Sequence, residues 1–136
     1  MVSKPQSWMT LAVSAADAAS DLRALHPRSS VSRAYYAAFA ACHALLSHLR
    51  PAVDWPKRDN FRHAELPGEL RWTLLHYLQN RVTSFQADVY RKSLETAYDL
   101  RRFGDYKPEL KVTPDHAQTA LESAFSLLRL AKEVVR

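Results

Sequence analysis

The pattern of hydrophobic positions centres on residues 31–49, VSRAYYAAFAACHALLSHL, in which Arg33 is the only Lys, Arg, Asp or Glu residue. Apolar residues recur there every three to four positions on one helical face, and a second apolar stripe lies beside the first. A helix that is apolar nearly all round must be covered on several sides. We therefore expect a buried central helix with more apolar surface than four short neighbours can readily cover, and hence a homodimer.

Four other segments have the apolar spacing of amphipathic helices, namely residues 5–25, 68–82, 85–103 and a segment from Pro114 nearly to the C-terminus. We expect Ser29 or Ser30 to cap the central helix, because a serine hydroxyl accepts from an unpaired backbone N–H. Gly104 is expected to end the fourth helix in a left-handed conformation. Thr113 is expected to cap the last helix, with Pro114 at its first position.

Residues 50–68 are the one long irregular stretch, with three prolines and many charged residues. A connection of this length in a small domain is usually mobile or functional. The chain has only two glycines and no alternating apolar–polar run of strand length. The sequence therefore predicts an all-α fold, an antiparallel (up-and-down) bundle of about five helices in a single domain spanning residues 1–136.

Composition narrows the class of protein only a little. Hydrophobic residues make up 47% of the chain and charged residues 24%, as in ordinary globular proteins. The net charge of +5 favours anionic partners such as RNA or nucleotides. The single cysteine, Cys42, excludes an internal disulfide and suits a reducing compartment. The N-terminal residues lack a signal-peptide pattern, and the central segment is too polar for lipid. We expect a cytoplasmic protein without membrane contact.

The six histidines do not form a recognisable metal motif, because none stands in HExxH and no Cys/His ligand cluster is present. We expect neither a metal nor another cofactor. Two histidines stand five positions after an arginine, in the pairs Arg58–His63 and Arg71–His76. With three permitted gap lengths, this many arginines and histidines would produce about two such pairs by chance. Neither pair is therefore assigned to a site.

The candidate chemistry lies in residues 94–106, LETAYDLRRFGDY. Arg101 and Asp105 are four positions apart, so they share a face of the last helical turn. Arg101 and Arg102 also place positive charge at a helix C-terminus, where the helix dipole favours cations. One interpretation is an exposed ion pair at a helix end. The other is that Arg33 and Tyr36 of the central helix meet these residues in a polar contact that holds an anion or a dimer partner.

The segments SRAYYAAFAACHALL, LETAYDLRRFGDY and VTPDHAQTALESA, in this order, resemble the HEPN family. They are most similar to its small stand-alone branch, which has an arginine shortly before a YYA-x-F segment and an L-R-x-x-x-DY helix end. The resemblance implies an up-and-down helical bundle, usually dimeric. It also implies a ribonuclease-like protein of toxin–antitoxin or antiphage defence systems, often paired with a small nucleotidyltransferase antitoxin.

Active HEPN proteins are metal-independent endoribonucleases with an R-N-x-x-x-H signature from each subunit. Arginine binds the phosphate through two hydrogen bonds, and histidine moves a proton to or from a ribose oxygen. If Arg101 matches the signature arginine, Arg102 replaces the asparagine and Tyr106 stands in the position of the histidine. Tyrosine is a poor general base at neutral pH. The resemblance therefore implies RNA or nucleotide binding without cleavage.

Three functions are consistent with these observations. The first is an RNA- or nucleotide-binding HEPN-like homodimer whose site comprises Arg33, Tyr36, Arg101, Arg102, Asp105 and Tyr106. The second is an active metal-independent endoribonuclease in which Arg101 acts with Tyr106, or with a histidine from the long connection or the other subunit. The third is a structural helical adaptor whose partner surface lies on residues 50–68.

Overall fold

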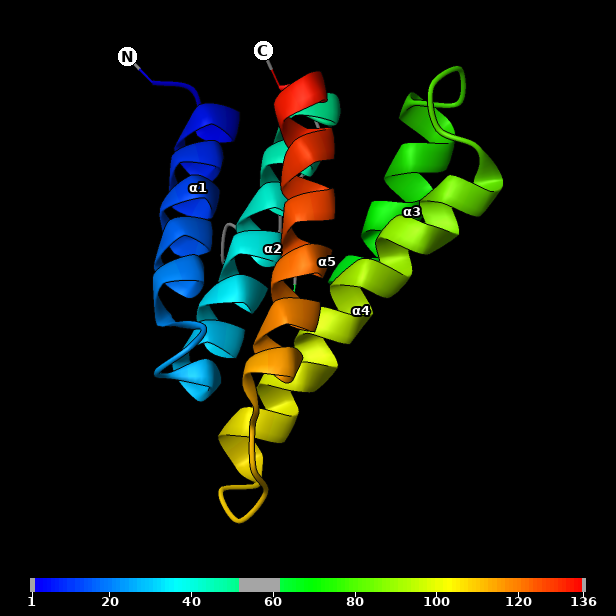
Figure 1. Ribbon diagram of the computed structural model, residues 1–136. Coiled ribbons are helices and arrows are strands. Elements are labelled where there is room, and N and C mark those ends of the chain that lie inside the picture. Colours follow the sequence, from blue (N-terminus) through cyan, green and yellow to red (C-terminus); the bar gives the residue numbers. More distant parts are fainter. Residues whose placement is uncertain (1, 52–61, 136) are drawn as a thin grey trace.

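A computed structural model describes residues 2–51 and 62–135 of the chain (Figure 1). The described residues form five α-helices and no strand, and the helices are α1 (Lys4–Leu22), α2 (Pro27–Leu49), α3 (Leu66–Tyr77), α4 (Ser84–Tyr106) and α5 (Pro114–Val134). The prediction of an all-α bundle of about five helices is confirmed; its antiparallel order stays a prediction. No helix of the described residues is long and apolar enough to cross a membrane.

Helix α2 is the centre of the fold and contacts each of the other four helices (Figure 1). Between residues 30 and 47, every side chain is buried except those of Ser32, Arg33 and Tyr36. The many alanines of this helix let its neighbours approach closely. The other helices and the connection before α3 therefore cover most of α2 within one chain, and the homodimer stays a prediction.

The start of α2 differs from the prediction. The helix begins at Pro27, and neither Ser29 nor Ser30 caps it. Proline suits a first helical position, because its φ is already helical and its missing N–H would have no partner there. The buried Ser30 hydroxyl instead donates to the carbonyl oxygen of Ala19, at 2.6 Å, and so ties α2 to α1.

The end of α4 also differs from the prediction. Helix α4 continues through Gly104 to Tyr106, and Gly104 does not adopt the expected left-handed conformation. The Arg28 guanidinium donates to the carbonyl oxygens of Gly104 and Leu110, the latter at 2.6 Å. A cation from α2 therefore satisfies carbonyl groups at this helix end, as a left-handed glycine would otherwise help to do.

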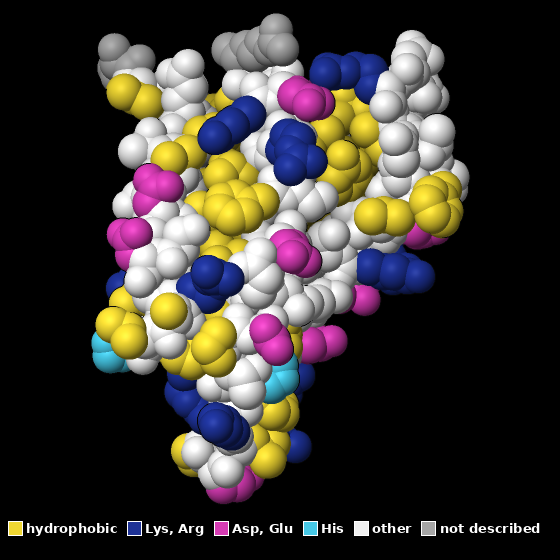
Figure 2. Space-filling model, viewed as in Figure 1, with side chains coloured by type: hydrophobic (Ala, Val, Ile, Leu, Met, Phe, Trp, Pro, Cys, Tyr) yellow, Lys and Arg dark blue, Asp and Glu magenta, His cyan; other side chains and the backbone are white. Residues whose placement is uncertain are grey.

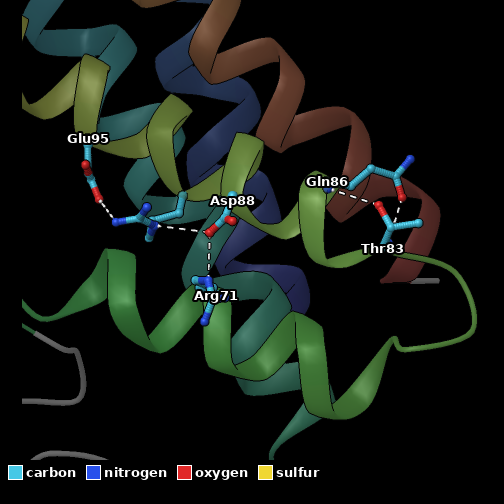
Figure 3. A network of polar contacts seen from close by, with 6 residues as sticks. Arg71, Thr83, Gln86, Asp88 and Glu95 are labelled. Atoms are coloured by element: carbon cyan, nitrogen blue, oxygen red, sulfur yellow. Dashed lines mark hydrogen bonds and ion pairs between the residues drawn. The ribbon is translucent and has the colours of Figure 1, made fainter.

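The last helix begins as the sequence predicts. The Thr113 hydroxyl accepts from the backbone N–H of His116 at 3.3 Å, while the His116 ring accepts from the Thr113 N–H at 3.0 Å. A similar capping box of Thr83 and Gln86 opens α4 (Figure 3). Both caps satisfy backbone donors that have no partner inside the helix.

An ion pair joins α3 to α4, and two further pairs lie within α4 (Figure 3). Arg71 of α3 lies 2.7 Å from Asp88 of α4, and Arg91 lies 3.7 Å from the same carboxylate and 3.0 Å from Glu95. The hydrogen bond from Arg71 lowers the pKa of Asp88. The Arg71–Asp88 pair and the buried leucines of α3 hold α3 in place. Helix α3 follows directly after the long connection.

Candidate functional site

The Arg101 side chain of α4 lies against two aromatic rings of α2. Its guanidinium carbon is 5.3 Å from the ring centroid of Tyr35 and 5.1 Å from that of Tyr36. Its Nε donates to the Asp105 carboxylate at 3.1 Å, which also keeps the guanidinium in place. A cation over aromatic faces is attracted by their quadrupoles. The arginine is therefore held by contacts from two helices, with 17% of its side chain exposed.

His63 lies next to this arginine, although it belongs to the connection before α3. Its ring centroid is 5.3 Å from that of Tyr35, 4.9 Å from that of Phe39 and 5.8 Å from that of Tyr98. The rings of His63 and Tyr98 are nearly parallel, 10° apart. The Tyr35 hydroxyl and His63 Nδ1 share a hydrogen bond. These contacts bring α2, α4 and the long connection together at one place.

The protonation states of this pair follow from burial and from the arginine. Burial lowers the pKa of His63, and the nearby Arg101 charge lowers it further. Burial raises the pKa of Tyr35 despite the opposing effect of Arg101. At neutral pH a neutral imidazole therefore meets a protonated phenol. If Tyr35 donates to Nδ1, Nε2 carries the ring proton; if Nδ1–H donates to Tyr35, Nε2 is an acceptor.

We call the group of Tyr35, Tyr36, His63, Tyr98, Arg101 and Asp105 the Arg101 cluster. It brings together three of the residues expected from the sequence, Tyr36, Arg101 and Asp105. Arg102, a fourth, is exposed at the edge of the cluster, with its guanidinium carbon 5.7 Å from the ring centroid of Tyr98. The cluster offers a cation, aromatic faces and a neutral imidazole within one small region.

The other two expected residues lie apart from the cluster. Tyr106 is 70% exposed and lines a shallow hollow of about 290 Å³ beside Arg102. Arg33 is exposed and lines a groove between α1 and α2. Within the described part of the chain, no hydrogen bond or ion pair joins Arg33 to Arg101 or Asp105.

Sequence reasoning set His63 aside as a chance match to R-x4-H, and only its nuclease alternative allowed for a histidine from the long connection. Arg58, the arginine of that match, lies outside the described residues. The second match, Arg71–His76, is on α3, where Arg71 pairs with an aspartate and His76 stacks on Trp72 at 4.2 Å. No local signal marks His63, because its neighbours in the cluster are far from it in sequence. Tyr98 could have been found, since it precedes Arg101 by three positions on one helical face.

The surroundings of the cluster are basic. In Figure 2, Lys and Arg side chains gather at the end of the molecule where α4 leads into α5. Residues 99–111 at this end contribute Arg101, Arg102, Lys107 and Lys111 against Asp99, Asp105 and Glu109, a small positive excess. In the described ranges, no group of three or more His, Cys, Asp or Glu side chains is arranged to hold a metal ion.

Comparison with known proteins does not place the chain in a family. No family model matches it, and neither a curated protein nor a solved structure shows significant similarity to it. The function must therefore be argued from the geometry of the chain itself.

Proposed function

We propose that this protein is a cytoplasmic, HEPN-like homodimer that binds RNA or a nucleotide at the Arg101 cluster, within a toxin–antitoxin or antiphage defence system. The observation that carries the proposal is the placement of Arg101 on the rings of Tyr35 and Tyr36, at 5.3 and 5.1 Å. Single-stranded nucleic acids are bound by this combination, in which bases stack on aromatic side chains and arginines contact phosphates.

The exposed parts of the cluster are the parts that such a ligand needs. Tyr36 is 40% exposed, so its ring is accessible to a base. The Asp105 contact is made through Nε of Arg101, which leaves the terminal nitrogens to donate to phosphate oxygens. Arg102 is exposed one residue further along the helix and can meet a second phosphate. The basic end of the molecule attracts polyanions to this region.

Fluorescence anisotropy with a labelled single-stranded RNA tests the proposal. Arg101→Ala removes one phosphate contact, so we expect about tenfold weaker binding and a salt dependence reduced by about one counterion. Arg129→Ala, at an exposed arginine of α5, is the matched control for charge and should bind as the wild type does. Tyr106→Phe should also leave binding unchanged. Equal losses for Arg101→Ala and Arg129→Ala would mean that only net charge matters, and would reject the site.

A second function, metal-independent endoribonuclease activity, is favoured by the position of His63. A neutral imidazole beside a phosphate-binding arginine can take the proton of a ribose 2′-hydroxyl. The 2′-oxygen then attacks the adjacent phosphorus, the bond to the 5′-oxygen breaks, and that oxygen takes a proton. The products are a 2′,3′-cyclic phosphate and a 5′-hydroxyl. His63, supplied by the long connection, would carry out the proton transfer for which Tyr106 is poorly suited.

Incubation with labelled RNA in the presence of a chelator separates binding from cleavage. Cleavage that is lost in His63→Gln and kept in Tyr106→Phe would establish the nuclease with His63 as proton carrier. Intact RNA bound by the wild type would establish binding alone. His76→Gln, at an exposed histidine of α3, is the control for loss of an imidazole.

The remaining partners rest on the resemblance. A nucleotidyltransferase antitoxin is the proposed protein partner, and pull-down with the product of a neighbouring gene would test it. The structural adaptor would use residues 50–68 as its partner surface. Residues 52–61 of this stretch lie outside the described residues, and no contact of the described ones favours an adaptor function.

A further inference from the structure

Helix α1 has a second apolar stripe that the other described helices cover only in part; Trp8 packs on Phe39 and His43 of α2, whereas Leu11 is 57% exposed. The inward face, Ala12, Ala16 and Ala19, is buried against the rest of the chain. The second stripe alternates between spacings of three and four and consists of Trp8, Leu11, Ala15, Ala18 and Leu22. All five residues line a groove of about 720 Å³, whose other wall is Arg33, Tyr36, Phe39 and Ala40 of α2. Such spacing is typical of a helix that packs lengthwise on another helix.

The charges of the groove indicate which helix it takes. Asp21 of α1 and Arg33 of α2 both line it, and neither forms an ion pair with a described residue. The contact of Ser30 with Ala19, together with that of Trp8 with Phe39, places Arg33 roughly level with residue 16 of α1. Along the groove, Arg33 and Asp21 therefore lie on opposite sides of Ala18.

This arrangement is self-complementary. A two-fold axis through Ala18, perpendicular to α1, would set the Arg33 of each copy opposite the Asp21 of the other. An isologous contact forms every such pair twice. Leu11, which is 57% exposed and seven positions before Ala18, would face the turn after the partner's α1, in which Leu25 is 83% exposed. Ala15 and Leu22 lie three and four positions from Ala18, so a small and a large side chain would face each other close to the axis.

We propose that the α1–α2 groove is the dimer interface of this protein, in which α1 of a second copy packs antiparallel on α1 with Ala18 at the two-fold axis. The inference rests on the homodimer of the proposed function and names its surface; it does not depend on RNA binding. Tyr36 lines the groove and also contacts Arg101, so the partner would cover part of the exposed Tyr36 ring and would form one wall of the ligand site at the Arg101 cluster. A ligand at one cluster would then lie next to the partner.

Charge exchange tests the interface by sedimentation equilibrium. Arg33→Asp and Asp21→Arg should each weaken the dimer about tenfold or more, because each creates two like-charge contacts. The double variant restores both pairs in reversed order and should recover the wild-type affinity. Asp17→Arg, at an exposed aspartate outside the groove, is the matched control and should dimerise normally. All three substituted positions are exposed, so the fold should persist and can be checked by circular dichroism.

A covalent readout gives an independent check. Ala18→Cys places two thiols at the axis and should form a disulfide-linked dimer on mild oxidation, whereas Asp17→Cys should not. The native Cys42 is fully buried and does not compete. If both charge variants dimerise with wild-type affinity, or if Ala18→Cys forms no disulfide-linked dimer, the groove is not the interface. The proposed homodimer would then still stand with another interface. A wild-type monomer at micromolar concentration would overturn both, and RNA binding would still be judged by its own assay.

Discussion

Two histidines pack on Phe39 and differ in what else surrounds them. The His43 ring centroid is 4.4 Å from that of Phe39 and 4.7 Å from that of Trp8, and its Nδ1 lies 3.1 Å from the Phe39 carbonyl oxygen. His43 is fully buried. His63 is 4.9 Å from the same phenylalanine but remains partly exposed and adjoins Arg101.

Burial is the largest cause of a lowered pKa for both histidines, to about 4 for His43. The shared cause has different consequences. His43 is enclosed, so its neutrality affects only the stability of the fold. His63 is at the surface beside a cation, where a neutral imidazole can reach a ligand. A perturbed histidine therefore indicates a site only when solvent and a second functional group are also present.

The largest expected effect is loss of stability in acid through His43. Its pKa is about 4 in the folded chain against 6.5 for an unperturbed histidine, so the unfolded chain takes up the proton first as the pH falls. The stability is complete above pH 6.5 and should decrease by about 3 kcal/mol by pH 4. Urea unfolding at several pH values measures it. His43→Leu should flatten this dependence, whereas His48→Gln, at an exposed histidine of α2, should not.

Tyr35→Phe should cost about 1 kcal/mol, the net contribution of one hydrogen bond, because it removes the hydroxyl that His63 Nδ1 contacts. The ring packing with Tyr98 stays. Thermal unfolding gives the stability, and the histidine NMR signals show which ring has changed. A shift of the His43 signal instead of the His63 signal would show that the two histidines do not have separate surroundings.

Arg101→Gln should raise the pKa of His63, because a positive charge that opposes imidazole protonation is removed. Deeper burial of His63 in the variant would instead lower its pKa, so the direction of the pKa change separates the two effects. NMR titration of the ring protons measures it. Arg102→Gln is the matched control, and the pKa of His43 should not change in either variant.

Asp105→Asn should have the smallest effect. Its ion pair with Arg101 is at a partly exposed helix end, so stability should change by no more than about 0.5 kcal/mol. Removal of the carboxylate frees the guanidinium, and RNA binding should strengthen about two- to threefold. Weaker binding would mean that Asp105 positions Arg101 for the ligand rather than competing with it.

The sequence by itself determined the features that depend on neighbours along the chain. The 3.6-residue periodicity predicted the helices, the apolar run of residues 31–49 predicted the buried centre, and Thr113 predicted the start of α5. The contact between Arg101 and Asp105 also follows from spacing, because positions four apart share a helical face.

Only the tertiary structure decided which distant residues meet. His63 is 28 positions from Tyr35, and the connection that brings it back has no periodicity to indicate its path. Gly104 remains helical, and Arg28, far away in sequence, donates to its carbonyl group. Ser30 contacts Ala19 rather than its own helix start. Such contacts depend on how whole helices pack, and short-range spacing carries no information about that packing.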